Sequence, residues 1–161
     1  MSLPRYSLDT RETAGSGMQV WDSIRKQWLT LTPEEHVRQS LIAFLTEGCG
    51  VPRGLVSLEK GLQYDRRKKR YDLLVYDRGG KPFILCECKE PRVPIDDAVV
   101  QQISLYNSKI EARILILTNG HQLLAFGRMA DGKWLALALP DPELGGGEIW
   151  FDEAERVFAS T

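Results

Sequence analysis

The sequence predicts an α/β fold in which helices cover a mixed β-sheet, and three observations support this fold class. A helix-start pattern at 32–35 precedes apolar residues at helical spacing. Strand-like runs follow, and the last two flank Gly79-Gly80, which favours a hairpin. A second helical segment, 95–112, leads into the continuous apolar run 113–118. The third and fourth strands of this order are joined through a helix, so we expect them to be parallel.

Length and composition fit one globular domain. The chain has 161 residues, of which 43% are hydrophobic and 27% charged, and its net charge is −1. No apolar run approaches the roughly 20 residues of a membrane span, and the N-terminus lacks a signal-peptide core. We therefore expect a cytoplasmic protein without membrane contact. Residues 1–17 are polar and are expected to form a flexible segment, with 18–161 as the single domain.

The remaining segments are expected to be short elements. Thr32 serves as a helix cap, Pro33 opens that helix, and the apolar stripe ends at Gly48 or Gly50. The other predictions are a hairpin of 18–21 with 28–31, strands at 55–63, 121–128 and 134–139, and a short strand or helix at 149–158.

Three cysteines, an odd number, agree better with a reducing compartment than with a disulfide framework. Cys86 and Cys88 share a strand face. A zinc site would need about four ligands, and Cys49, His36 and His121 are the available additions. We favour buried thiols over zinc.

The hairpin over 71–89 places charged residues together. If Gly79-Gly80 is the two-residue loop, Asp72 lies opposite Glu87, and alternation puts Lys89 on the same face. A four-residue loop gives the same register, whereas a three-residue loop or a bulge shifts it.

Facing carboxylates at the ends of apolar strands repel each other. A divalent cation relieves this repulsion, and Mg²⁺ prefers oxygen ligands such as those of Asp72 and Glu87. The alternative is an exposed strand end at which Lys89 neutralises Glu87.

Asp72, followed after fourteen residues by Glu87-Cys88-Lys89, resembles the D…(D/E)-x-K pattern of the PD-(D/E)XK nuclease superfamily. Tyr71 stands where the family name has proline. Segments 24–39, 68–91 and 102–107 look like the N-terminal nuclease domain of type I restriction enzyme R subunits and its stand-alone relatives. The resemblance covers roughly 18–140 and implies a restriction-endonuclease-like αβββαβ core.

This resemblance implies Mg²⁺-dependent hydrolysis of DNA, with Mn²⁺ as a substitute. Asp72, Glu87 and the backbone carbonyl of Cys88 would hold the metal, while Lys89 would orient water or stabilise charge on phosphorus. Glu35 has two interpretations. The resemblance places an acidic residue of the first helix at the metal, whereas the spacing makes Glu35 the partner of Thr32 in a capping box.

Gln102 and Tyr106 lie one turn apart on the second helix. In the resembling family they face the active-site strands, where Gln102 would place water or phosphate and Tyr106 would lie beside the DNA. The alternative is a core position for Tyr106 and a half-exposed one for Gln102.

An unbroken basic run precedes Asp72 and could hold DNA phosphates near the metal. Its alternative is a solvated turn. The run comprises Arg66, Arg67, Lys68, Lys69 and Arg70.

Type I R subunits join such a nuclease to an ATP-driven motor. This sequence contains no G-x-x-x-x-G-K-[ST] loop. We therefore expect a stand-alone nuclease, or a module that meets a motor or specificity subunit in trans. A homodimer is compatible with cutting both strands of a duplex. The alternative function is a catalytically silent nucleic-acid-binding or assembly subunit.

Overall fold

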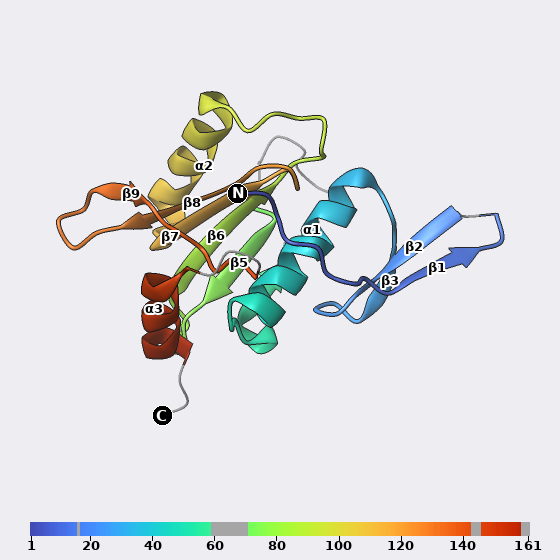
Figure 1. The fold of residues 1–161 in the computed structure, drawn as a ribbon, viewed down its shortest axis with the longest axis horizontal. Helices are drawn as coiled ribbons and strands as arrows, with labels where there is room; N and C mark the ends of the chain where they lie inside the picture. The colour runs from blue at the N-terminus through green and yellow to red at the C-terminus, as the bar shows by residue number, and fades with distance from the viewer. Residues whose placement is uncertain (16, 59–70, 143–145, 159–161) are drawn as a thin grey trace.

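The computed structural model describes residues 1–15, 17–58, 71–142 and 146–158. Within them a larger mixed sheet carries helices on both faces, and a smaller sheet projects from one side (Figure 1). The elements in chain order are β1 (Thr10–Thr13), β2 (Gly17–Asp22), β3 (Gln27–Thr30), α1 (Pro33–Ala43), a π-helical turn (Phe44–Gly48), a 3₁₀ turn (Arg53–Leu55), β4 (Val56–Leu58), β5 (Leu73–Tyr76), β6 (Pro82–Cys88), α2 (Asp97–Ile110), β7 (Ile114–Thr118), β8 (Leu123–Arg128), β9 (Trp134–Ala136) and α3 (Glu148–Phe158).

The larger sheet has the order β4-β5-β6-β7-β8-β9. Strands β6 and β7 are parallel and are joined through α2, while the other neighbouring pairs are antiparallel. This arrangement confirms the predicted α/β class and the αβββαβ order of the core, which runs from α1 to β7.

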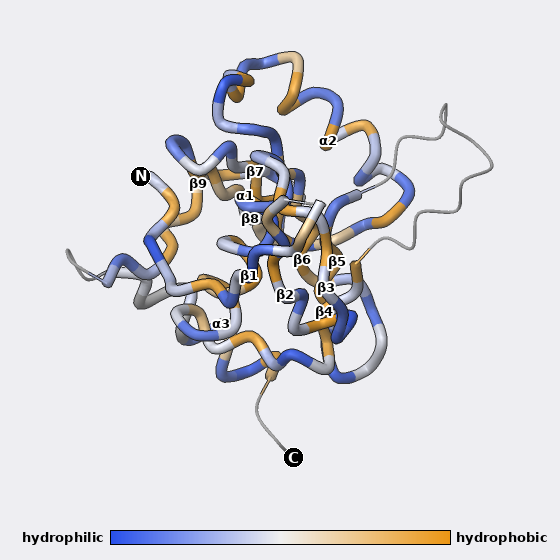
Figure 2. Tube along the Cα trace, turned by 90° about the vertical axis from the view of Figure 1, so that its right-hand side faces the viewer, coloured by the Kyte–Doolittle hydropathy of each residue, from blue (hydrophilic) through white to orange (hydrophobic). Residues whose placement is uncertain are grey.

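Helices α1 and α3 pack on one face of the sheet and α2 on the other. Val37 and Leu41 of α1 and Trp150 of α3 share a buried cluster with alternate residues of the central strands, such as Ile84. On the opposite face, Ile103 of α2 packs in a second cluster. Figure 2 shows the hydrophobic segments concentrated along the central strands. Because β5, β6 and β7 are buried on both faces, their sequences are apolar without alternation.

Helix α1 begins as its sequence predicts. The Thr32 hydroxyl accepts a hydrogen bond from the Glu35 amide at 3.0 Å, and Pro33 occupies the first turn. The regular helix ends at Ala43, and the π-helical turn continues to Gly48. The predicted end of the helical segment at Gly48 is therefore confirmed.

The central hairpin has the predicted register but a different turn. Leu73 pairs with Cys86 and Leu74 with Leu85, which is the register that places Asp72 opposite Glu87. The turn is not the two-residue Gly79-Gly80 loop, because Asp77 and Lys81 already pair through an amide-to-carbonyl bond of 2.8 Å. The loop has three residues, and an irregularity between Val75 and Tyr76 restores the register.

The N-terminal residues contribute a strand and a buried side chain to the described structure. Strand β1 pairs with β2, and β2 pairs with β3, which confirms the predicted hairpin. Leu3 is buried, and its amide donates to the carbonyl of Gly120. Apolar burial at Leu3 and strand pairing at β1 thus contact the rest of the chain from within residues 1–17.

The C-terminal segment is helical. Of the two forms expected for 149–158, the structure has α3, whose Trp150 indole donates to the Cys49 carbonyl at 2.9 Å. The strand predicted at 55–63 is seen as β4, and 59–70 lie outside the described residues. None of the helices in the described part of the chain has the length and apolar character needed to cross a membrane.

Candidate active site at the ends of β5 and β6

The charged residues of the D…E-x-K pattern lie where β5 begins and β6 ends. Asp72 directly precedes β5, and its amide donates to the Cys86 carbonyl at 3.2 Å. Glu87 is the next-to-last residue of β6, and Lys89 follows the strand. Because the two strands are antiparallel, these ends coincide in space. The Lys89 amide also donates to Thr118 at the end of β7, which fixes the backbone there.

Both carboxylate oxygens of Asp72 have donors. Oδ2 accepts from the Cys88 amide at 2.7 Å, and Oδ1 accepts from Nη2 of Arg38 at 2.7 Å. Strand alternation would direct Asp72 toward the α2 face, which Leu74 occupies. Since Asp72 precedes the regular strand, its carboxylate instead reaches the first turns of α1.

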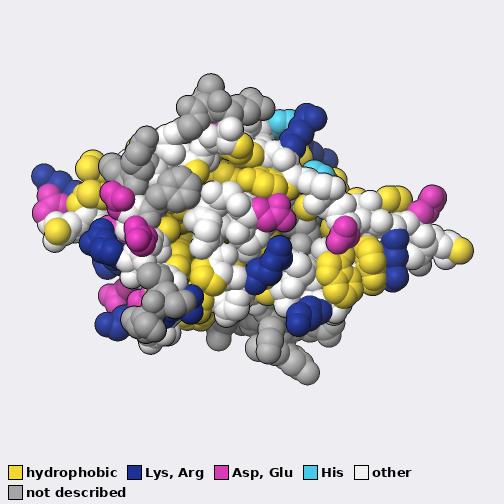
Figure 3. Space-filling model, turned by 60° about the horizontal axis from the view of Figure 1, so that its bottom comes forward, with side chains coloured by type: hydrophobic (Ala, Val, Ile, Leu, Met, Phe, Trp, Pro, Cys, Tyr) yellow, Lys and Arg dark blue, Asp and Glu magenta, His cyan; other side chains and the backbone are white. Residues whose placement is uncertain are grey.

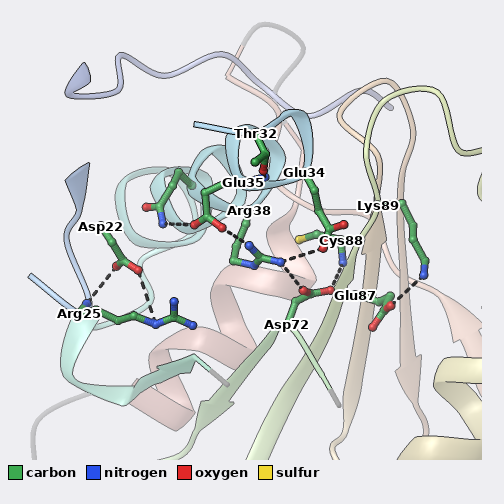
Figure 4. A network of polar contacts seen from close by, with 11 residues as sticks. Asp22, Arg25, Thr32, Glu34, Glu35, Arg38, Asp72, Glu87, Cys88 and Lys89 are labelled. Carbon is green, nitrogen blue, oxygen red and sulfur yellow. Dashed lines mark hydrogen bonds and ion pairs between the residues drawn. The ribbon is translucent and has the colours of Figure 1, made fainter. Parts of the chain in front are cut away.

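Arg38 is a site residue that the sequence reasoning missed. Its guanidinium lies among three carboxylates, those of Glu34, Glu35 and Asp72 (Figure 4). Glu34 and Glu35 precede Arg38 by four and three residues, which is the spacing of ion pairs on one helix face. That local pattern was available in the sequence, whereas the contact with Asp72 joins residues 34 apart.

The acidic surroundings keep Arg38 charged. Burial by itself lowers the pKa of Arg38, but the charge of Asp72, its hydrogen bond and the charge of Glu35 outweigh burial and raise that pKa above its ordinary value. Arg38 is therefore a permanent positive charge next to Asp72.

Glu35 has features of both interpretations. Its amide is capped by Thr32, whereas its carboxylate accepts from Gln39 at 2.9 Å and pairs with Arg38. The side chain does not complete a reciprocal capping box, because it is turned toward Arg38 (Figure 4). The structure thus links Glu35 to Asp72 through one guanidinium.

Glu87 and Lys89 form a second charged group. Nζ of Lys89 lies 3.2 Å from Oε1 of Glu87. Glu87 is 7% exposed, so this strand end is buried, whereas its pairing with Lys89 is the one that the alternative interpretation expects. Burial makes the pairing of Glu87 matter, because an unneutralised carboxylate there would be costly.

The second helix places its two candidate residues differently. Tyr106 is partly buried against the cluster between α2 and the sheet, whereas Gln102 is exposed. This agrees with a packing contribution from Tyr106 and leaves Gln102 accessible from outside.

The thiols lie in the core. Cys49, Cys86 and Cys88 are free and buried, and burial raises the pKa of each thiol, that of Cys49 to about 12. Neutral buried thiols behave as small apolar side chains. In the described ranges no group of three or more His, Cys, Asp or Glu side chains is arranged to hold a metal ion of any kind.

The oxygen atoms that a cation could use come from the two strand ends. They are the carboxylates of Asp72 and Glu87 and the carbonyl of Cys88. Two carboxylates and a carbonyl form a hard donor set of the kind that Mg²⁺ uses when water and phosphate complete its shell. The donor chemistry therefore fits Mg²⁺ or Mn²⁺.

The basic run lies outside the described residues. It comprises Arg66, Arg67, Lys68, Lys69 and Arg70. On the face drawn in Figure 3, basic side chains of the described part alternate with acidic ones and do not merge into one positive surface.

Comparison with protein families matches residues 33–137 to the family described as "Type I restriction enzyme R protein N terminus (HSDR_N)". The match begins with α1 and ends just after β9. It thus includes Arg38, Asp72, Glu87 and Lys89. Comparison with curated proteins found no match to the chain.

Proposed function

We infer the function of this chain from the premise that it belongs to the family of type I restriction enzyme R protein N termini. The family match covers more than half of the 161 residues and supports a restriction-type nuclease domain. We propose, more specifically, that the chain is a metal-dependent DNA endonuclease that hydrolyses phosphodiester bonds.

One observation carries this proposal. The pairing of Leu73 with Cys86, continued by one residue, brings the backbone of Asp72 next to that of Glu87, and Lys89 pairs with Glu87. A protein that only binds DNA does not need carboxylates close to the bound phosphates, because carboxylates and phosphates repel each other. A cation-dependent hydrolase does require them.

Asp72, Glu87 and the Cys88 carbonyl would hold Mg²⁺, and Mn²⁺ would substitute for it. When bound, the cation supplies Lewis-acid polarisation of phosphate and a lowered pKa of bound water. Glu35 contributes indirectly, through the guanidinium that it shares with Asp72. Its role as a direct metal ligand is the less favoured one.

The chain's own side chains would perform the remaining tasks. The Lys89 ammonium is held at Glu87 and would orient the attacking water or stabilise negative charge on the phosphate. Gln102, exposed on α2, would contact water or phosphate, and the partly buried Tyr106 would support α2 beside the DNA.

DNA is the proposed partner, and the basic run over 66–70 is the proposed phosphate-binding segment. The slope of log affinity against log salt is negative, and each phosphate that a variant no longer neutralises should make it shallower by about 0.9 for duplex DNA. The test is a fluorescence-anisotropy titration at several salt concentrations with four basic residues changed to glutamine. Equal affinity at low salt would make the run a solvated turn. The four residues are Arg66, Arg67, Lys68 and Lys69.

Besides DNA, the proposed partner is a motor or specificity subunit in trans, which would supply motion along DNA or sequence specificity. A homodimer would place two sites on a duplex. Size-exclusion chromatography with light scattering, without and with DNA, distinguishes a single-copy enzyme from a DNA-assembled dimer.

Cleavage of plasmid and single-stranded DNA in Mg²⁺ or Mn²⁺ tests the central proposal. Asp72→Asn and Glu87→Gln should each lower the cleavage rate by at least about a hundredfold, the usual scale for removing one preorganised charge. Asp77→Asn and Glu90→Gln are matched controls, because they make the same chemical changes in the hairpin turn and in a surface pair with Arg92.

Equal cleavage by the wild type and both site variants would refute the catalytic assignment. Tight DNA binding without cleavage in any of these proteins would favour the alternative, a catalytically silent nucleic-acid-binding or assembly subunit. The ion pair between Arg38 and Asp72 is the observation that keeps this alternative open, because it occupies one proposed metal ligand.

A further inference from the structure

Arg38 pairs with one of the two carboxylate oxygens of Asp72, the residue proposed as a metal ligand. The Asp72 carboxylate has two oxygens. The Cys88 amide donates a hydrogen bond to Oδ2, and Nη2 of Arg38 donates one to Oδ1 at 2.7 Å. The Arg38 side chain is 16% exposed, so solvent screens this pair only in part. A divalent cation that approaches Asp72 therefore meets a fixed positive charge on the same carboxylate.

Arg38 has alternative partners on its own helix. Its Nη2 atom is shared between Asp72 and Oε1 of Glu34, the latter at 2.9 Å, while Nη1 pairs with Glu35. Glu34 and Glu35 belong to the same helix as Arg38. If the pair with Asp72 breaks, the guanidinium keeps two carboxylate partners and does not become an isolated buried charge.

We propose that Arg38 is a built-in counter-cation for Asp72, which it must release before the site binds its divalent metal. Arg38 holds the Asp72 carboxylate in the metal-free protein and moves onto Glu34 and Glu35 when the cation binds. It is a positioning residue that sets metal affinity. This inference rests on the proposed function, because it takes Asp72 as a metal ligand.

Isothermal titration of metal-free protein with Mn²⁺ tests the inference without an activity assay. Arg38→Met removes the charge and the competing ion pair, and should lower the Kd for Mn²⁺ by about tenfold, corresponding to one favourable ion pair that need not be broken. Arg53→Met is the matched control. It removes the same charge from an exposed pair with Glu47 and should change the Kd by less than about twofold.

A second measurement uses the wild type alone, in case Arg38→Met fails to fold. Titration with diamagnetic Mg²⁺, followed by NMR of the arginine side-chain Nε–Hε groups, should shift the Arg38 signal saturably and leave the Arg53 signal in place. The midpoint should agree with the Kd measured for Mg²⁺ by calorimetry.

The outcomes separate this inference from the function on which it rests. Mg²⁺-dependent cleavage by the wild type, combined with equal Mn²⁺ affinity of Arg38→Met and wild type, or with an unmoved Arg38 signal, overturns the inference alone. A similar gain in affinity for Arg53→Met also overturns it, since net charge would then explain the effect. Absence of both cleavage and metal binding in the wild type overturns the proposed function and this inference together.

Discussion

Replacing Asp72 by asparagine should destabilise the metal-free protein, although the two side chains have the same shape. Asp72 accepts hydrogen bonds on both oxygens, from the Cys88 amide and from Arg38. Asparagine has one acceptor oxygen and one amide that only donates. In either orientation of the amide, one donor of the protein faces another donor.

The magnitude follows from the hydrogen bond that asparagine cannot accept. A hydrogen bond to a charged group contributes about 1.5–3 kcal/mol, so the free energy of unfolding should fall by about 2 kcal/mol for Asp72→Asn. Arg38 keeps Glu34 and Glu35, and for that reason the larger cost of a fully unpaired buried charge does not apply.

Urea denaturation at neutral pH in the presence of a chelator measures the effect. Asp77→Asn is the matched control, because the Asp77 side chain accepts from the Lys81 amide through a single oxygen that asparagine retains. Its unfolding free energy should stay within about 0.5 kcal/mol of wild type. An equally small change for Asp72→Asn would refute the idea that Asp72 satisfies both donors. Cleavage by Asp72→Asn should be assayed well below its unfolding midpoint.

Three further predictions concern the scaffold. Asn107→Ala should lower the free energy of unfolding by about 2–4 kcal/mol in urea denaturation, because the buried Asn107 side chain hydrogen-bonds both the N–H and the C=O of Ala112, at 2.8 and 3.0 Å. Asn107→Asp keeps only the acceptor and should lower it less. An unchanged free energy of unfolding for Asn107→Ala would contradict this role. Thr32→Ala should lower the free energy of unfolding by about 1 kcal/mol and Thr32→Ser should leave it almost unchanged, since only the hydroxyl caps α1. Equal stabilities of the two variants would show that the cap does not stabilise the protein. Unfolding free energy should fall as pH rises above 9, by about 1.4 kcal/mol per pH unit for each buried thiol. Burial raises the native pKa of Cys49 from 9.0 to about 12, and it raises that of Cys86 further. The thiols of the unfolded chain therefore lose their protons at lower pH than those of the native protein. Cys49→Ala should flatten this pH dependence, and an unchanged slope would count against it.

Local rules were sufficient for much of the fold. Thr32 and Pro33 mark the start of α1 because capping and a fixed φ depend on neighbouring residues only. The parallel pairing of β6 and β7 follows from the helix between them. The hairpin register was predicted from the position of the turn, and it agrees with the structure because two irregularities offset each other.

The turn between β5 and β6 shows where local rules stopped. Two glycines favour a two-residue loop, yet Gly80 alone takes a positive φ, of 83°, and the loop includes Arg78. A second irregularity at Val75 and Tyr76 compensates for the added residue. Because the two deviations cancel, the same residues face each other as with a two-residue loop. The hydrophobic pattern of the strands therefore does not reveal either deviation.

The contact between Arg38 and Asp72 could not be predicted from the sequence for a similar reason. Its spacing from Glu34 and Glu35 indicates ordinary ion pairs on a helix surface. The third carboxylate comes from Asp72, which alternation assigns to the other face of the sheet. Only the position of Asp72 before the first paired residue of β5 lets it reach α1, and strand ends are the least predictable feature of a sequence.

The most direct test of a cation site at the ends of β5 and β6 is a crystal soaked with Mn²⁺ and measured at its absorption edge. We expect an anomalous peak between Asp72 and Glu87, about 2.0–2.3 Å from carboxylate oxygens, with Arg38 turned onto Glu34 and Glu35. A crystal that shows no peak there, and in which Arg38 still pairs with Asp72 at saturating Mn²⁺, would contradict a cation site at these strand ends.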